Sequence, residues 1–144
     1  MIKNIKIIFT FFFLFIFFNQ ISHAKDSYFE NGKKLFDNKK FLESKFYFEK
    51  DIVFNTKNEN SYLYLAKIFN EEKKDNLEEN NLNTVLLLNP KNEEGIYLLT
   101  LLNIKRSNFS KAKELMLTMS SICKNMCTVQ SELQEKLDSS QNSK

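Results

Sequence analysis

The sequence predicts an all-α protein, and three observations support that prediction. Apolar side chains recur at the spacing of one helix face, most clearly at Phe41, Ser44, Lys45, Phe48 and Ile52. In that stripe Ser44 is small, and the Lys45 stem can lie along an apolar surface. No segment alternates apolar and polar residues as a half-buried strand does. Only two glycines and one proline interrupt the 144 residues.

Residues 1–24 have the layout of a secretory signal peptide. Lys3 and Lys6 precede twelve almost purely apolar residues at 7–18, and an A-x-A-like site ends at Ala24. Twelve residues are well short of the ~20 that span a bilayer as a helix. We therefore expect cleavage after Ala24 and export to the periplasm. The alternative is an uncleaved segment that anchors the chain to the inner membrane, facing the periplasm.

The 120 residues after the signal are enough for one small domain. Without the signal the formal net charge falls from +3 to +1, so nucleic-acid binding is not indicated. His23, the single histidine, lies in the signal, which excludes a Ser-His-Asp triad and His-ligated metal sites. The glutamate pairs could act as acid and base, but solvated helix ends explain them better; these pairs are 71–72, 78–79 and 93–94. We expect no catalytic residues, no cofactor and no metal.

The helical segments recur with a period of 34 residues, in blocks at 25–58, 59–92 and 93–126. Each block divides into two helical halves joined by a turn. The first block has small or large apolar residues at spacings of 0, 3, 4, 9, 12 and 16, namely Gly32, Leu35, Phe36, Phe41, Ser44 and Phe48. The later blocks fill several of the same places, with Ala66, Phe69 and Leu82 in the second and Thr100, Phe109, Ala112 and Met116 in the third.

This pattern resembles the tetratricopeptide repeat (TPR), carried here by the phrases NGKKLFDNKKFLESKFYFEK, YLYLAKIF…LLLNPKN and SNFSKAKELM. The resemblance covers residues 25–126. It implies an α-solenoid of about three TPR helix pairs within a domain spanning residues 25–138. The expected helices are 27–38, 41–54, 59–72, 77–88, 93–106, 109–122 and 126–138.

Three places depart from the family pattern. Asp51 and Glu78 occupy positions where the family usually has a small residue. The segment 71–75 lacks the expected aromatic residue, which predicts a longer turn there with Leu77 covering the gap.

The last expected helix, 126–138, has the pattern of a cap. Its apolar residues form a single stripe, while its other side is polar, as a terminal repeat requires; the stripe is Met126, Val129, Leu133 and Leu137. Residues 139–144 are polar, and we expect a disordered tail.

Cys123 and Cys127 are the only cysteines, and they lie between the third repeat and the cap. In an oxidising compartment an even number of cysteines favours a disulfide. A bridge in mid-helix would be strained, so the pair predicts a break near residues 124–125, with Asn125 as N-cap of the last helix. Free thiols remain the alternative, and a redox or metal site is disfavoured because the spacing is not C-x-x-C and further ligands are missing.

The resemblance also implies a concave groove lined by the first helix of each pair. Its inward positions are Phe29, Lys33, Phe36, Leu63, Lys67, Asn70, Tyr97 and Leu101. Aromatic, aliphatic and hydrogen-bonding side chains together suit an extended peptide or a partner helix. The sequence thus favours a non-enzymatic adaptor in the cell envelope with an unidentified protein partner. The alternative is a structural subunit of an envelope complex, or a self-assembling scaffold.

Overall fold

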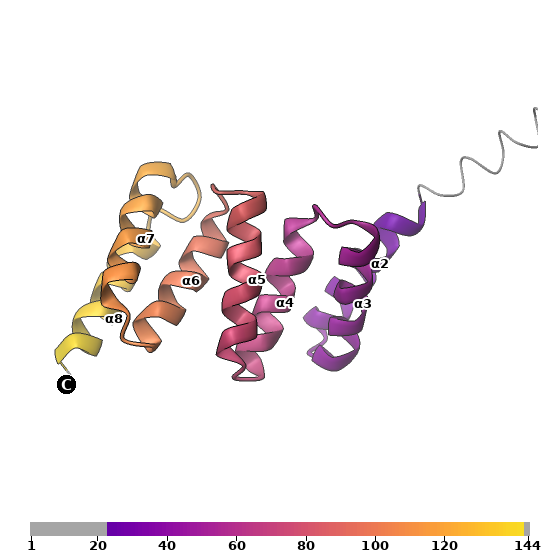
Figure 1. Ribbon diagram of the computed structural model, residues 1–144, viewed down its shortest axis with the longest axis horizontal. Coiled ribbons are helices and arrows are strands. Elements are labelled where there is room, and N and C mark those ends of the chain that lie inside the picture. The colour runs from indigo at the N-terminus through magenta and orange to yellow at the C-terminus, as the bar shows by residue number, and fades with distance from the viewer. Residues whose placement is uncertain (1–22, 143–144) are drawn as a thin grey trace, which may run out of the picture. The chain divides into compact units, whose positions relative to one another are not determined.

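The computed structural model describes residues 23–142, with side chains described from residue 28 onward. Almost all of the expected signal peptide lies outside the described residues. Seven helices and no strand are found between residues 23 and 142 (Figure 1). They are α2 (His23–Asp37), α3 (Phe41–Phe54), α4 (Glu59–Glu71), α5 (Asp75–Leu88), α6 (Glu93–Lys105), α7 (Phe109–Ile122) and α8 (Val129–Asn142). The all-α prediction is confirmed. None of the helices described is long and apolar enough to cross a membrane.

The chain divides into two compact units, which we describe separately. The first unit contains α2 and α3 and ends at Thr56, and the second begins at Lys57 and contains α4 to α8.

In the first unit, α2 and α3 pack closely because small residues lie at their contact. The Ser44 hydroxyl donates a hydrogen bond of 2.8 Å to the carbonyl oxygen of Gly32. A Cβ atom at Gly32 would lie only 2.8 Å from the ring of Phe48, which is fully buried. Asp51, one of the departures from the family pattern, is also buried on α3.

The 34-residue period appears directly in the backbone. The turns within the three helix pairs each contain one residue with positive φ, at Lys39 (59°), Lys73 (56°) and Ser107 (59°). In each turn the residue that follows the one with positive φ donates its backbone N–H to the carbonyl oxygen five residues earlier. Lys40, for example, donates to Leu35 at 2.9 Å. The expected longer turn in the second repeat is therefore wrong. Leu77 does not cover a gap there, because it is 42% exposed.

In the second unit, α5 packs between α4 and α6, and α6 packs against α7. Their apolar stripes meet in one core, which includes Leu63, Ala66, Leu82, Val85, Ile96, Leu99, Leu102, Leu115 and Met119. Helix α6 begins at an N-cap, where the Asn92 side chain accepts a hydrogen bond of 2.8 Å from the amide of Gly95.

Helix α8 caps this core, as expected from its single apolar stripe. Leu133 and Leu137 are fully buried against Ile104 and Ala112. The helix starts three residues later than predicted, at Val129, so Asn125 is not its N-cap. It also continues through Asn142, and residues 139–142, which we had expected to be disordered, are helical.

Candidate protein-binding surface

In the first unit, the three predicted groove residues lie on α2 and differ in character. The rings of Phe29 and Phe48 pack with centroids 5.8 Å apart, and those of Phe36 and Phe41 with centroids 5.3 Å apart. Phe29 and Phe36 are half-buried, and their contacts with α3 contribute to the packing of α2 on α3. Lys33 forms an ion pair of 2.9 Å with Asp37, one helical turn later.

In the second unit, Lys67 is the predicted residue that links two of the lining helices. Its Nζ lies 2.7 Å from a carboxylate oxygen of Glu94, so the pair joins α4 to α6. The same Nζ lies 4.5 Å from the centre of the Tyr64 ring, a cation–π distance. The ammonium group is thus held in one place while its side chain is still partly open to solvent.

The other predicted residues of the second unit are placed differently from one another. Leu63 lies in the core with 4% of its surface exposed, so it offers no surface to a partner. Asn70 is exposed but directs its amide inward, donating hydrogen bonds of 3.0 and 3.1 Å to both oxygens of Glu78. Tyr97 and Leu101 pack against the cluster that α6, α7 and α8 form together.

Helix α8 thereby covers part of the surface that the sequence assigned to the groove. The Tyr97 hydroxyl donates a hydrogen bond of 3.0 Å to Glu132 on α8. Partial burial and this contact with Glu132 raise the pKa of Tyr97. The hydroxyl stays protonated, and its hydrogen bond connects α6 to the cap.

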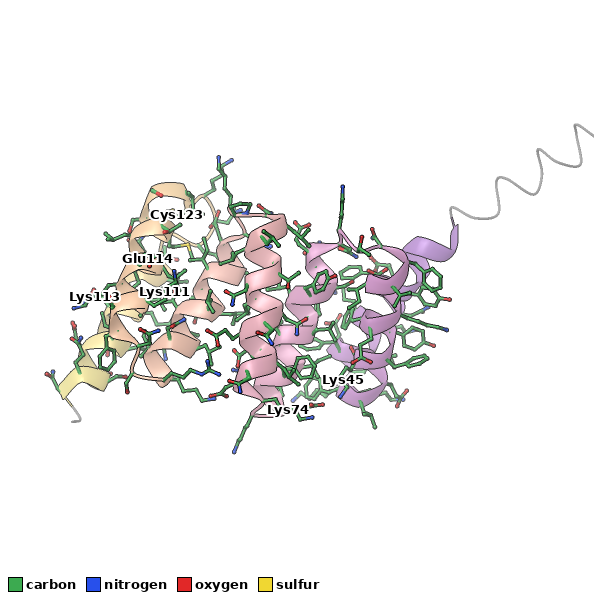
Figure 2. All side chains as sticks on the ribbon, in the orientation of Figure 1. Lys45, Lys74, Lys111, Lys113, Glu114 and Cys123 are labelled. Atoms are coloured by element: carbon green, nitrogen blue, oxygen red, sulfur yellow. A yellow bond between two sulfur atoms is a disulfide. The ribbon has the colours of Figure 1, made fainter. Side chains whose placement is uncertain are left out.

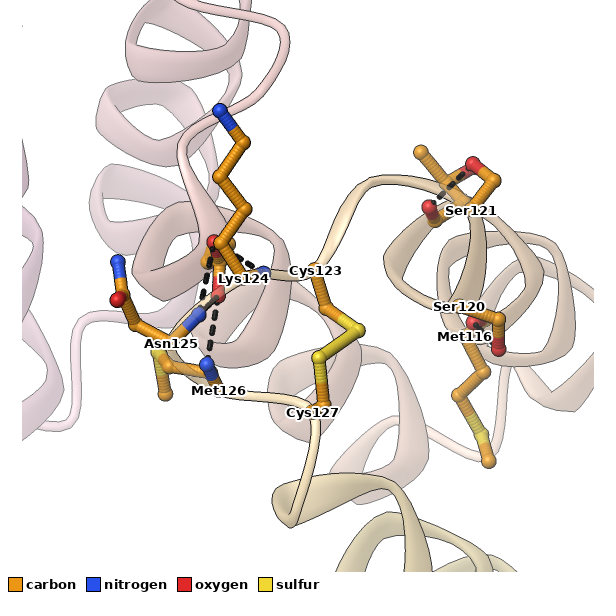
Figure 3. The surroundings of a disulfide bond; sticks show 10 residues. Met116, Ser120, Ser121, Cys123, Lys124, Asn125, Met126 and Cys127 are labelled. Carbon is orange, nitrogen blue, oxygen red and sulfur yellow. Dashed lines mark hydrogen bonds between the residues drawn. A yellow bond between two sulfur atoms is a disulfide. The ribbon is translucent and has the colours of Figure 1, made fainter.

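A second feature of the same unit, which the sequence did not indicate, surrounds the disulfide. Cys123 and Cys127 are bonded, and their Cα atoms lie 5.2 Å apart across the break between α7 and α8. The five-residue loop that they close directs successive backbone N–H groups at Glu93 on α6 (Figure 3). Lys124 donates at 2.8 Å, Asn125 at 3.0 Å and Met126 at 2.7 Å.

These three donors form an anion-binding nest that is filled by a carboxylate of the chain itself. The N–H of Met126 contributes most to holding the pKa of Glu93 below its usual range, with smaller contributions from the N–H groups of Lys124 and Asn125. Glu93 thus ties the start of α6 to the loop that leads into the cap. Sequence reasoning assigned Glu93 only to a solvated helix end, because its partners lie about thirty residues away.

Helices α7 and α8 together offer a different surface. An open hollow of about 490 Å³ between α7 and α8 is lined by Lys113, Met116, Leu117, Ser120, Gln130, Ser131 and Gln134. Figure 2 shows Lys111, Lys113 and Glu114 on α7, where Lys111 pairs with Glu114 at 2.7 Å. Within residues 23–142, no group of three His, Cys, Asp or Glu side chains could hold a metal ion.

No family model matches this chain, and no curated protein matches it. Solved structures do. The first TPR domain of Spaghetti (RPAP3), bound to the HSP90 peptide SRMEEVD, aligns with a TM-score of 0.71 and 17% identity. That alignment covers 80% of this chain and 94% of that domain.

Two further structures align at similar quality. The Yersinia enterocolitica type III secretion chaperone SycD, in complex with a peptide of the translocator YopD, has a TM-score of 0.71 at 8% identity, covering 82% of this chain and 92% of that chain. The TPR2B domain of yeast Sti1, in a complex with pHsp70, has a TM-score of 0.70 at 10% identity, covering 83% and 98%. Such identities show the fold alone, and the chain therefore has the tetratricopeptide-repeat fold that its 34-residue period predicted.

Proposed function

We propose that the protein is a non-enzymatic adaptor that binds a peptide or a partner helix on helices α4 and α6 of the second unit. The observation that carries this proposal is Lys67, whose ammonium group is held between Glu94 and Tyr64 and is still partly solvent-accessible. Two of the similar structures described above contain a bound peptide, which supports a recognition role for the fold.

The proposed surface uses the predicted residues that retain access to solvent. In the second unit these are Lys67, Asn70, Tyr97 and Leu101. Leu63 is left out because it is a core residue.

Recognition at Lys67 would work by exchange of partners. A carboxylate or backbone carbonyl of the bound segment replaces or joins Glu94 as acceptor, while the Tyr64 ring stays beneath the ammonium group. Because the cation is already positioned, little side-chain entropy is lost on binding. The same preorganisation disfavours segments that bring a second positive charge to this point.

We place this activity in the periplasm, with the chain either released from its signal or tethered by it. The signal-like residues 1–24 support export, and the bond between Cys123 and Cys127 is of the kind that persists in oxidising compartments.

The test is site-specific photocrosslinking in intact cells. A photoreactive residue at Glu71, exposed on α4 one turn beyond Lys67, samples the proposed surface. The same residue at Leu87, exposed on α5, is the control. We expect an adduct with one partner protein from position 71 and none from position 87.

A pair of charge variants completes that test. Lys67→Ala should abolish the adduct from position 71, whereas Lys113→Ala, which removes an exposed lysine from α7, should leave it unchanged. Adducts that persist in Lys67→Ala, or that form equally from position 87, contradict the proposal. Adducts between copies of this chain alone would favour the structural alternative.

A further inference from the structure

Exposed apolar side chains are concentrated on one helix of the first unit. Of the large apolar residues that are exposed, four lie on the 14-residue helix α3: Leu42 (76%), Phe46 (55%), Val53 (70%) and Phe54 (63%). The other exposed residues of this kind are on α5 and α7 of the second unit. Leu42, Phe46 and Val53 follow helical spacing on the side of α3 opposite to the buried Ser44 and Phe48. This is an apolar stripe that the helix pair itself does not need.

Aromatic rings extend the stripe to the part of the unit where α2 begins. The Tyr28 ring on α2 stacks on Phe54 with centroids 5.7 Å apart and lies 6.5 Å from Tyr47. Tyr47 in turn contacts Phe46 edge-on at 5.7 Å. Lys50 Nζ lies 5.0 Å from the centre of the Tyr28 ring and 5.3 Å from that of Phe46. The border of the apolar stripe near Tyr28 therefore combines aromatic rings, tyrosine hydroxyls and a lysine.

We propose that this surface, consisting of Leu42, Phe46, Val53 and Phe54 with Tyr28, Tyr47 and Lys50, docks on a lipid bilayer. We call it the α3 face. Its chemistry is that of membrane-interface anchors, where aliphatic and aromatic groups enter the boundary of the acyl chains and tyrosine and lysine stay among the headgroups. Lys50 can lay its stem along the rings and bring its ammonium group to lipid phosphates.

In the anchored form of the chain, which keeps residues 1–24, the preceding sequence favours a bilayer over other occupants. The apolar run at residues 7–18 ends five residues before α2 begins at His23. At ~3.6 Å per residue, an extended chain of that length spans at most about 18 Å. Tyr28 lies five residues further along α2, which adds roughly 7.5 Å at the rise of an α-helix. In that anchored form, a bilayer that holds residues 7–18 is within reach of the α3 face.

Tryptophan fluorescence can test the proposal cleanly, because the chain contains no tryptophan. Phe46→Trp places a single reporter on the α3 face, and Leu87→Trp places one at the exposed site on α5. Both positions are exposed, so neither change disturbs the core; Val53→Trp serves as a second reporter. The full chain is reconstituted with vesicles of phosphatidylethanolamine and phosphatidylglycerol, with or without bromine in the acyl chains.

We expect brominated lipid to quench about half of the emission at position 46, as for a group at the headgroup boundary, and to leave position 87 nearly unchanged. Lys50→Glu should weaken the quenching at position 46, whereas Lys113→Glu on α7 should not. Equal quenching at positions 46 and 87, or none at either, overturns the proposal. A blue-shifted emission at position 46 without vesicles, together with concentration-dependent sedimentation, would show that a second copy covers the face and would overturn it too.

Discussion

At the scale of single residues, a buried carboxyl group occupies a place where the repeat pattern calls for a small side chain. Glu78 on α5 is 2% exposed, and the Asn70 amide on α4 donates to both of its oxygens. Burial raises the pKa of Glu78, and the hydrogen bonds from Asn70 oppose that shift. The sequence showed that Glu78 stands where the family has a small residue. The hydrogen bonds from Asn70 that compensate for its burial depend on how α4 and α5 pack.

The raised pKa of Glu78 predicts a pH dependence of stability. The folded chain holds a proton at Glu78 up to a higher pH than the unfolded chain does. Its contribution to the free energy of unfolding is fully present below the ordinary pKa of 4.5 and is lost as the pH rises through the raised value. Glu78→Gln cannot ionise, so the variant should gain stability relative to the wild type on going from acid to neutral pH. Urea denaturation across this range measures the difference.

A matched control is Glu135→Gln, an exposed glutamate on α8. The free energy of unfolding of the Glu135→Gln variant should change with pH in the same way as that of the wild type. Parallel curves for Glu78→Gln as well would contradict the assignment of a raised pKa to this carboxyl group.

At the scale of elements, each helix pair depends on close approach at one point. In the first unit that point is Gly32 on α2, against the ring of Phe48 on α3. The 34-residue spacing places Ala66 and Thr100 at the equivalent positions of α4 and α6, and both are fully buried. In the first unit a small residue is needed there because the Phe48 ring of α3 lies directly against it.

Gly32→Ala should destabilise the protein by about 1–3 kcal/mol, because the added methyl group overlaps the Phe48 ring. Alanine is favoured over glycine in a helix interior by roughly 1 kcal/mol, so a net loss identifies the packing clash. Chemical denaturation measures it. Glu30→Ala, an exposed change on the same helix, should be close to neutral. A Gly32→Ala protein as stable as the wild type would mean that α2 and α3 can separate without loss.

The loop from α7 to α8 is held by two kinds of contact, the disulfide and the nest around Glu93. Bridging so short a loop removes little entropy from the unfolded chain, so the double variant Cys123→Ser, Cys127→Ser should lose about 2 kcal/mol of stability. Urea denaturation of the oxidised wild type and the variant gives this difference, and the wild type in reductant should match the variant. Intact-mass measurement should find the oxidised protein lighter by two hydrogen atoms. Equal stability in the presence and absence of reductant would sink this prediction.

At the scale of the whole molecule, the fold was predictable because its signals are local. Turns with positive φ at Lys39, Lys73 and Ser107 repeat the 34-residue spacing, although none of the three is glycine. The second repeat has this turn although it lacks the aromatic residue. Asp75 begins α5 at the position where Phe41 begins α3 in the first repeat. Backbone hydrogen bonding within each turn was enough to maintain the geometry.

The candidate surface was predictable only in part. The repeat period assigned Lys67 to a lining helix, but it did not reveal the pairing with Glu94, twenty-seven residues later. It did not distinguish Leu63, which enters the core, from Tyr97, which α8 partly covers. Each of these outcomes depends on a neighbouring helix that a repeat pattern does not specify.

The sequence by itself determined the helices, their period and the break at the cysteines, because spacing and turn chemistry act over a few residues. Only the tertiary structure decided which side chains remain available to a partner. It placed Glu93 in the loop nest and Glu78 beneath Asn70, and it left the α3 face exposed. The reason is physical: burial and electrostatic pairing arise between different segments of the chain, eight residues apart for Asn70 and Glu78 and thirty-three apart for Glu93 and Met126. Their strength depends on the packing that brings those segments together.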